Sequence, residues 1–503
     1  MNYKFSKYIS EDAIKVQIVN TDNVEKFLSS ELLQLTKFEG KYKQILHLPE
    51  SKSVYIGVTK ESTIKSIDVW NKVDYYELGA NLVNSLAKTN YSKFILEGFS
   101  NTDNSIEVQK ENLMRFCLGM YQAAWHLDSF LPENKAKTKK IILSISESDI
   151  HLKTLELEKE IDALTKGIIL TRELIELPPQ VINPSTIGEK INSELGDNPN
   201  ISITLLDRAK LEQMKMGAFL AVGRASIHAP VLAHIVLTPS KNVKHRIALI
   251  GKGLTYDSGG LDIKISGFMK TMKIDMGGAA TMFGIIKALS LLKLNHTEVH
   301  WISAFAENML GGDAYKADDI LTSYSGQTIE VFNTDAEGRL TLADALTYAT
   351  LQNPDYIIDA ATLTKACMRA VTEYFTALMG NDQELIDSLQ EAFIEEQEKT
   401  VYVPMAEILR EQVQGEIADL INTGKDPSMG GHITAGLFLS HFVDQNLFRN
   451  SELDIHSPKA YKWAHLDIAG SVYNKYKNSI GVDGATGQTV RSLVKFIQKI
   501  DIA

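Results

Sequence analysis

The stretch RIALIGKGLTYDSGGLDIK, Arg246 to Lys264, is the most informative part of the chain about its fold. Its first five residues, Arg246–Ile250, are mostly apolar, as in a short strand that is buried on both faces of a sheet. A glycine-rich loop, Gly251 to Lys264, is predicted to follow this strand. Glycine lets backbone bend sharply and approach a ligand closely, so the stretch predicts a buried strand that leads into a functional loop.

From about residue 180 onward, strand patterns alternate with helical patterns. The other predicted strands are Ile201–Leu205, Val231–Leu237, Glu298–Phe305, Thr328–Phe332, Tyr356–Ile358 and Ala464–Ile468. The predicted helices between them include Gly278–Leu291, Leu340–Thr350 and Gln383–Gln397. This alternation predicts an α/β domain over 180–503, with a mostly parallel sheet flanked by helices. In such sheets, sites form beyond the carboxyl ends of the strands, so we expect this domain to carry the site.

The first third of the chain predicts a smaller N-terminal α/β domain over 1–151. Its predicted strands are Lys15–Val19, Ser53–Val58, Lys93–Leu96 and Lys140–Ile145, and its clearest helices are Glu77–Ala87 and Asn112–Trp125. A charged amphipathic stretch follows and predicts a linker helix over 152–179, which Leu177-Pro178-Pro179 ends. At roughly 150 residues per domain, the length of 503 residues favours two to three domains, and the two predicted here fall within that range.

Composition excludes several classes of protein. With 44% apolar and 23% charged residues, the chain is globular rather than disordered or collagen-like. Its two cysteines, Cys117 and Cys367, form no zinc pattern or disulfide framework, which indicates a reducing compartment. The first twenty residues lack the apolar core of a secretory signal, and no run of 18 apolar residues occurs. We therefore expect a cytoplasmic protein without a membrane span.

The net charge of −11 lies entirely outside the first 150 residues, where 19 basic and 19 acidic residues balance. An acidic chain is a poor candidate for non-specific nucleic-acid binding. The one local basic cluster is formed by Lys135, Lys137, Lys139 and Lys140, and it fits a solvated turn. Excess carboxylates elsewhere serve either solubility or cation binding, and their spacing decides between the two.

Three predicted loops carry chemically active side chains in glycine-rich surroundings. They are GKGLTYDSGGLDIK from Gly251, MKIDMGG from Met272, and NTDAEGRL from Asn333. The carboxylates in them are Asp257, Asp275, Asp335 and Glu337, and the cations are Lys252, Lys264 and Arg339. In extended backbone Asp335 and Glu337 would point to one side, since they are two residues apart.

Four converging carboxylates cannot all ionise unless cations neutralise them. Two divalent ions would supply +4 against −4, and paired metals bridged by carboxylates drive hydrolytic reactions. Oxygen ligands suit Mg²⁺ or Mn²⁺, and Zn²⁺ also accepts them. The alternative for each loop alone is a plain turn or a helix N-cap. The phosphate-loop pattern GxxxxGK[ST] and the zinc motif HExxH do not occur.

The segment NTDAEGRL closely resembles the signature of the leucyl aminopeptidase family, the two-metal cytosol aminopeptidases. Further blocks agree in order and spacing: LPPQVINP, GKGLTYDSGG, MKIDMGGAA, DAATLT, WAHLDIAG and GATGQTVRSLVKFI. The resemblance covers roughly residues 165–503. It implies a metalloaminopeptidase that removes the N-terminal residue, preferably leucine-like, from peptides with a free N-terminus.

The resemblance also implies a role for each matching residue. The metal ligands would be Lys252, Asp257, Asp275, Asp335 and Glu337, with Asp257 and Glu337 bridging two divalent ions, Mn²⁺ or Zn²⁺. Lys264 would be the catalytic lysine, and Arg339 would hold a bicarbonate that acts as general base. The substrate-binding residues would be Met272, Thr362, Leu363 and Ala469. The family also implies a homohexamer.

Two segments depart from the family pattern. Lys365 stands where the family usually has glycine after ATLT, and Thr423–Gly436 differs near its glycines. The long cation of Lys365 would either alter substrate preference or point to solvent. Two other functions stay open: a different two-metal hydrolase, for example of phosphoesters, and an additional DNA-binding regulatory role.

Overall fold

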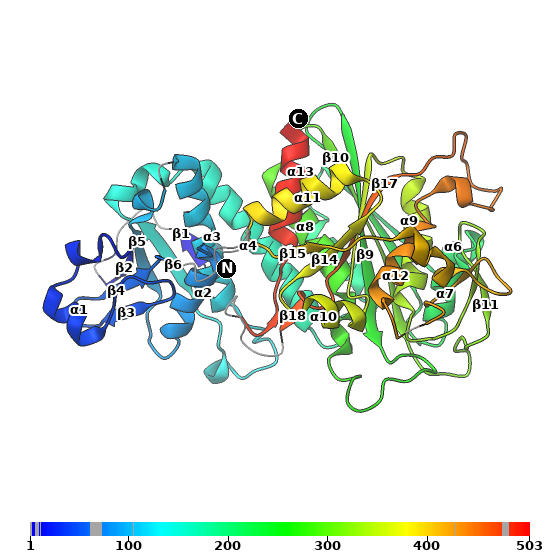
Figure 1. Cartoon of the computed structure of the whole chain (residues 1–503), viewed down its shortest axis with the longest axis horizontal. Helices are drawn as coiled ribbons and strands as arrows, with labels where there is room; N and C mark the ends of the chain where they lie inside the picture. The colour runs from blue at the N-terminus through cyan, green and yellow to red at the C-terminus, as the bar shows by residue number, and fades with distance from the viewer. Residues whose placement is uncertain are drawn as a thin grey trace. The chain divides into compact units, whose positions relative to one another are not determined.

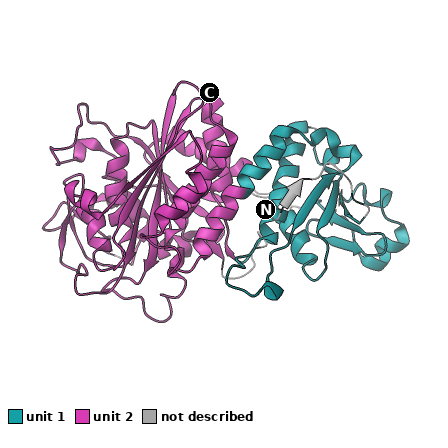
Figure 2. Ribbon diagram, turned by 180° about the vertical axis from the view of Figure 1, so that it is seen from behind, with its two compact units in different colours: residues 1–165, 475–483 teal, residues 166–474, 484–503 magenta. Residues whose placement is uncertain are grey.

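The computed structural model describes residues 3–5, 10, 12–60, 73–103, 105–426, 428–474 and 482–502 (Figure 1). All the predicted site residues lie within these ranges. The chain divides into two compact units, residues 1–165 with 475–483, and residues 166–474 with 484–503 (Figure 2). The division between them falls inside one helix, α4 (Leu155–Glu176), which corresponds to the predicted linker. The division into domains over 1–151 and 180–503, joined by a linker over 152–179, remains a prediction.

The first unit is an α/β fold around a six-stranded sheet in the order β1-β6-β5-β2-β4-β3. The strands are β1 (Tyr3–Phe5), β2 (Ile14–Val19), β3 (Ile45–Leu48), β4 (Ser53–Gly57), β5 (Lys93–Glu97) and β6 (Ile141–Ile145). All pair in parallel except β3 with β4. Helices α2 (Tyr75–Ser85) and α3 (Ile106–Ala124) cross at Gly79 and Gly119. A Cβ on either glycine would lie within 2.1 Å of a carbonyl oxygen of the other helix, so only glycine permits this approach.

The second unit is built on an eight-stranded sheet in the order β15-β14-β17-β13-β9-β10-β8-β7. Its strands are β7 (Ile201–Leu206), β8 (Val231–Leu237), β9 (His245–Asp257), β10 (Thr297–Asn308), β13 (Tyr356–Ala361), β14 (Thr376–Gly380), β15 (Thr400–Tyr402) and β17 (Lys462–Asp467). The four central strands, β17, β13, β9 and β10, are parallel, as predicted. The sheet is mixed at both sides, because β14 pairs antiparallel with β17, and β8 with β10.

Helices cover both faces of this sheet (Figure 1). On one face lie α8 (Gly277–Leu292), α11 (Gln383–Glu395) and α13 (Val490–Ile502), and on the other α7 (Gly217–Gly223), α9 (Gly338–Thr350) and α12 (Gly431–Ser440). The core between the sheet and the helices α7, α9 and α12 includes Trp463, Phe438 and Phe442, all fully buried. The fold class predicted for this part of the chain is therefore confirmed.

Two predicted strands differ from the structure in ways that affect the site. The strand that begins near Arg246 does not end at Ile250 but continues to Asp257, so Lys252 lies within β9 rather than in a loop. The predicted strand Thr328–Phe332 is a short strand, β12 (Thr328–Glu330), outside the main sheet. It belongs to a three-stranded sheet with β11 (Ile320–Thr322) and β16 (Leu420–Ile421).

One segment, Met272–Leu292, is long and apolar enough by length and composition to cross a membrane. It consists of a 3-10 turn, η5 (Met272–Met276), followed by α8, and 78% of its most apolar stretch is buried inside the structure. The core helix of a protein that does not enter a membrane has the same properties. The segment is therefore weak evidence for a membrane span.

Candidate active site

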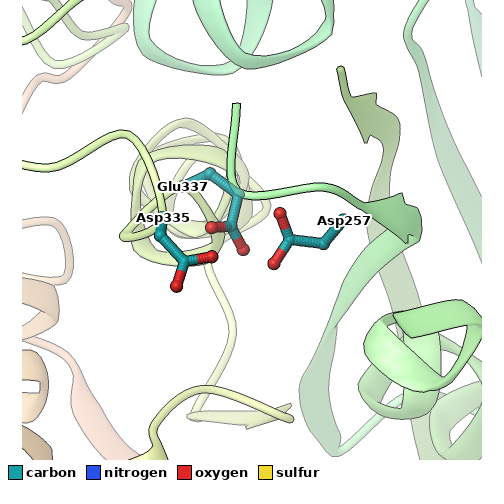
Figure 3. A group of neighbouring side chains, drawn as sticks. All are labelled: Asp257, Asp335 and Glu337. Carbon is teal, nitrogen blue, oxygen red and sulfur yellow. The ribbon is translucent and has the colours of Figure 1, made fainter. Parts of the chain in front are cut away.

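Three carboxylates from two distant segments meet at the carboxyl end of the central strands. Asp257 is the last residue of β9, and Asp335 and Glu337 lie in the turn that precedes α9. One oxygen of each lies within 4.8 Å of the others, and the three side chains point toward one another (Figure 3). The segment before α9 is a turn rather than extended backbone, so the predicted reason for the approach of Asp335 to Glu337 is wrong, although the two do converge.

Asp275 completes the acidic group through a buried lysine. Lys252 Nζ lies 2.8 Å from Asp275 Oδ2 and 2.9 Å from Glu337 Oε1, and it donates to the carbonyl oxygen of Thr362 at 3.1 Å. Asp275 comes from η5, the turn before α8, and its Oδ1 accepts a hydrogen bond from the Thr362 hydroxyl at 2.9 Å. Lys252 therefore links three parts of the site: the turn η5, the residue that precedes α9, and the segment that follows β13.

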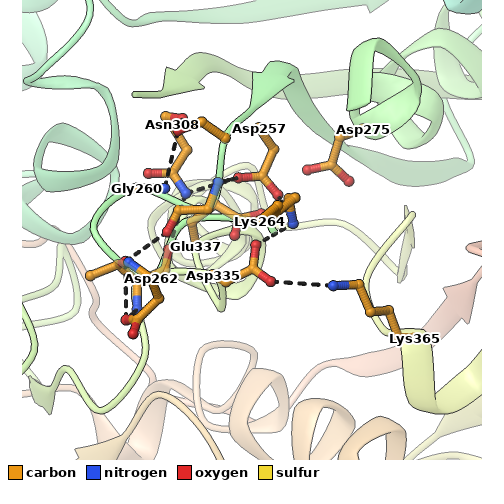
Figure 4. Close-up of polar contacts among 12 residues, drawn as sticks. Asp257, Gly260, Asp262, Lys264, Asp275, Asn308, Asp335, Glu337 and Lys365 are labelled. Carbon is orange, nitrogen blue, oxygen red and sulfur yellow. Dashed lines mark hydrogen bonds and ion pairs between the residues drawn. The ribbon is translucent and has the colours of Figure 1, made fainter. Parts of the chain in front are cut away.

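A second lysine, Lys264, joins the remaining two carboxylates. Its Nζ lies 2.6 Å from Asp257 Oδ2 and also contacts Asp335 Oδ1 (Figure 4). Asp257 Oδ1 faces away from this lysine and accepts from the amide of Gly259 at 2.8 Å and from Asn308 Nδ2 at 2.9 Å. Each of the two lysines thus lies between two carboxylates.

Burial and like charge shift the acid–base properties of this group. Burial raises the pKa of Asp257 to about 6, with a further contribution from the Glu337 carboxylate. Burial also raises the pKa of Asp275 well above its usual value. For Glu337, burial favours the neutral acid, but the Lys252 and Lys264 ammonium groups outweigh it and lower its pKa. Burial opposes the charge on both lysines, yet the surrounding carboxylates raise the pKa of each.

Several buried polar atoms at the site have no partner among the described residues. Glu337 Oε2 accepts no hydrogen bond, and Arg339 Nε and Nη1 donate none. Arg339 is 7% exposed, and burial lowers the pKa of its guanidinium to about 10, so it remains charged at neutral pH. A buried acceptor beside three other carboxylates fits a cation, and two buried guanidinium donors fit a planar anion.

All the predicted site residues line one pocket of about 290 Å³. Besides the seven charged residues, this holds for the four predicted substrate-binding residues, Met272, Thr362, Leu363 and Ala469. His296 and His300, two histidines four residues apart in the sequence, do not line this pocket. His300 instead bonds to Glu298 and His234 within the sheet.

The sequence interpretation missed residues that hold the site loops in place. Thr334 donates to the carbonyl of Gly259, and its own amide donates to Asp262, which ties the loop after β9 to the turn before α9. Asp467, the last residue of β17, accepts from the amides of Leu363 and Ala469 and from the Thr364 hydroxyl. Its position at the end of a predicted parallel strand was the available signal.

Lys365 points into the pocket and not only to solvent. It begins α10 (Lys365–Val371), and its Nζ lies 3.6 Å from Asp335 Oδ2 (Figure 4).

In the N-terminal unit, Lys139 of the basic cluster donates to the carbonyl oxygens of Leu86, Ala87 and Thr89. That lysine caps the end of α2 rather than presenting a free cation.

Comparison with known proteins identifies the family. Residues 169–494 match the model of the cytosol aminopeptidase family, catalytic domain. The chain belongs to this family. A probable cytosol aminopeptidase of Wolinella succinogenes is 35% identical over 498 residues, which cover 98% of this chain and 97% of the relative. One from Campylobacter jejuni is 40% identical over 76% of this chain and 77% of its own length.

Solved structures agree with the same family along nearly the whole chain. A tomato leucine aminopeptidase mutant superposes with a TM-score of 0.82 at 30% identity, covering 99% of this chain and 96% of its own. The cytosol aminopeptidase from Coxiella burnetii gives a TM-score of 0.81 at 26% identity and 99% coverage of both chains. Membership of the family makes this chain a metalloaminopeptidase of the leucyl aminopeptidase type that acts on peptides, as its motifs predict.

Proposed function

We propose that the chain removes leucine-like N-terminal residues from peptides by means of two divalent ions held by Lys252, Asp257, Asp275, Asp335 and Glu337. The observation that carries this proposal is the approach of one oxygen each of Asp257, Asp335 and Glu337 to within 4.8 Å of one another, with Glu337 Oε2 buried and without a hydrogen-bond partner in the described part of the chain. In the absence of ions, Lys252 and Lys264 offset only half of the four negative charges. Two divalent ions at these ligands would supply +4 against the four negative charges and would activate water for attack on a carbonyl.

Lys252 and Lys264 would then have different tasks. As a ligand, Lys252 must offer a neutral amine, so it has to lose the proton that its carboxylate neighbours stabilise in this structure. Lys264 would keep its proton and donate to the carbonyl oxygen of the scissile bond as that oxygen becomes negative. Its position between Asp257 and Asp335 supports this role, because these carboxylates favour the charged ammonium.

Arg339 would hold a bicarbonate ion through Nε and Nη1, two buried donors that find no partner among the residues that the structure describes. Such an anion supplies a general base beside the acidic group. Burial strengthens this interaction, since little water competes for the guanidinium.

Met272, Thr362 and Ala469 would contact the side chain of the first residue, and Leu363 the substrate backbone. These residues line the same pocket as the acidic group. Preference for leucine-like residues would be modest, since one methylene contributes about 1–3 kcal/mol of discrimination. We further propose Mn²⁺ or Zn²⁺ as the ions, a homohexameric assembly and a cytoplasmic location, the last supported by the names of the relatives.

A panel of aminoacyl-amides, assayed with Mn²⁺, Zn²⁺ or Co²⁺ added to metal-stripped enzyme, tests this proposal. We expect leucinamide to be cleaved fastest, and N-acetyl-leucinamide not at all, because the free amine is required. Equal cleavage of the free and blocked amides would contradict the exopeptidase assignment. Cleavage of p-nitrophenyl phosphate instead would favour the phosphoester alternative. Sedimentation velocity tests the hexamer.

A further inference from the structure

Lys365 places a flexible cation at the wall of the pocket. Its side chain is 53% exposed, in contrast to Lys252 and Lys264, which are 3% and 5% exposed. The ammonium lies 5.2 Å from the centre of the Phe268 ring, within the range of a cation–π contact. It contacts Oδ2 of Asp335, whereas Lys264 contacts Oδ1 of the same carboxylate (Figure 4).

Among the described residues, the wall around Lys365 contains no carboxylate. This wall is formed by residues of α10, of the segment after β16 and of the start of α12, namely Lys365, Met368, Thr423, Gly424, Gly431 and Thr434. Among the described residues that line this wall, Lys365 is the only charged one. The four acidic residues that line the pocket, by contrast, all belong to the proposed metal centre. An anion that enters the pocket beyond that centre would therefore meet a positive charge whose carboxylate neighbour, Asp335, belongs to the proposed metal centre.

The contact between Lys365 and Asp335 depends on the negative charge of Asp335. In the proposed function Asp335 binds a divalent ion, which removes that attraction and adds a repulsive charge. Lys365 is exposed enough to turn toward the pocket opening. The second residue of a bound peptide begins at the nitrogen of the scissile bond, and its Cα lies about 3.8 Å from that of the first, so we expect a carboxylate on it to come within reach of this side chain.

We propose that Lys365 determines specificity by binding a carboxylate on the second residue of the substrate. This inference rests on the proposed function, because it assumes that the first residue occupies the metal centre. The carboxylate can have two sources: the C-terminus of a dipeptide, or an aspartate or glutamate side chain at the second position. The enzyme would then favour dipeptides and peptides with an acidic second residue.

Two substrate pairs separate these sources. Leu-Asp-amide against Leu-Asn-amide tests the side chain, and Leu-Gly against Leu-Gly-amide tests the C-terminal carboxylate. For each pair the ratio of kcat/KM is measured, since a ratio is independent of the fraction of active or metal-loaded enzyme. We expect the wild type to favour at least one of the two acidic substrates by about threefold to fivefold, the range of a partly exposed ion pair. The difference should lie mainly in KM and decrease with added salt.

Lys365→Ala should bring the kcat/KM ratio of the pair that the wild type discriminates to about one. Lys365→Glu should reverse the preference for charge, so that Leu-Lys-amide is cleaved faster than Leu-Asp-amide. Lys425→Ala is the matched control, because Lys425 is an exposed cation next to Gly424 that does not line the pocket. Its ratios should equal those of the wild type. A carboxylate preference that persists in Lys365→Ala, or its absence from the wild type in both pairs, would overturn the inference. Failure to cleave leucinamide with any metal would instead contradict the proposed function.

Discussion

Lys252 and Lys264 show how single residues keep four carboxylates together. Each ammonium lies between two carboxylates, Lys252 between Asp275 and Glu337 and Lys264 between Asp257 and Asp335. The two positive charges leave a net of −2, since all four acids carry a negative charge when ionised. The raised pKa of Asp257 reflects this remaining repulsion together with burial. The site is therefore arranged to accept further positive charge.

Glu337→Ala should abolish the binding of two ions. The side chain is 2% exposed, contacts Lys252, and has a second oxygen with no partner among the described residues. Its loss removes a proposed bridging ligand, so we expect at most one tightly bound ion per chain and activity lowered by orders of magnitude. Metal analysis after dialysis measures the stoichiometry. Two ions retained in this variant would show that Glu337 does not bridge.

Lys264→Ala should differ from Glu337→Ala in its metal content. We expect this variant to retain both ions while its kcat falls. A donor to a developing oxyanion contributes about 10²–10³-fold to kcat. Lys270→Ala, a variant of an exposed lysine in the following segment, serves as the control and should retain wild-type turnover. Loss of metal together with activity in Lys264→Ala would assign this lysine to metal binding instead.

At the scale of secondary-structure elements, the ends of β9, η5 and the turn before α9 bring the acidic residues together. The order of motifs along the sequence was sufficient to predict a parallel core, and every residue that the family resemblance assigned to the site lines the pocket. The glycines at 251 and 253 hid the true length of β9, because glycine usually marks a loop while here it permits close packing. A Cβ on Gly251 would lie 2.5 Å from Ala279 Cα in α8.

Other features depend on contacts that no local pattern encodes. The strand β12 pairs with β16, some ninety residues later, so its place outside the main sheet could not be inferred from its own sequence. The same holds for Asn308 and Asp467. Their hydrogen bonds to Asp257 and to the amide of Leu363 join residues that are far apart in the sequence. The direction of Lys365 likewise became evident only in three dimensions.

Gly338→Ala tests how closely α9 must approach β9. A Cβ at this position would lie 2.5–2.7 Å from the side-chain atoms of Lys252, which is buried and held by three partners. We expect the displaced amine to weaken metal binding and lower activity, with a loss of stability of about 1–3 kcal/mol from overpacking. Gly312→Ala is the control, because a Cβ there meets nothing within 4 Å. Equal metal affinity in the two variants would argue against Lys252 as a ligand.

At the scale of the whole molecule, the site lies within the second unit, and its charge couples metal binding to global stability. The metal-free protein keeps buried carboxylates close together, which costs folding free energy whenever they ionise. Ions that bind the folded chain and not the unfolded chain recover this cost and add the free energy of binding. Thermal unfolding should therefore report on the site, although the site is a small part of 503 residues.

Added Mn²⁺ should raise the unfolding temperature more at pH 7.5 than at pH 5. The folded-state pKa of Asp257 is about 6, above the usual 3.8, so its protonated form is favoured by folding. Its contribution to the stability of the metal-free protein is present at low pH and lost as the pH rises from about 4 through 6. Metal binding requires the ionised form, so below pH 6 each displaced proton weakens binding by about tenfold per pH unit. Differential scanning fluorimetry of stripped enzyme, with and without Mn²⁺ and reversed by EDTA, measures the shift. An equal shift at both pH values would mean that the ions bind elsewhere than at Asp257.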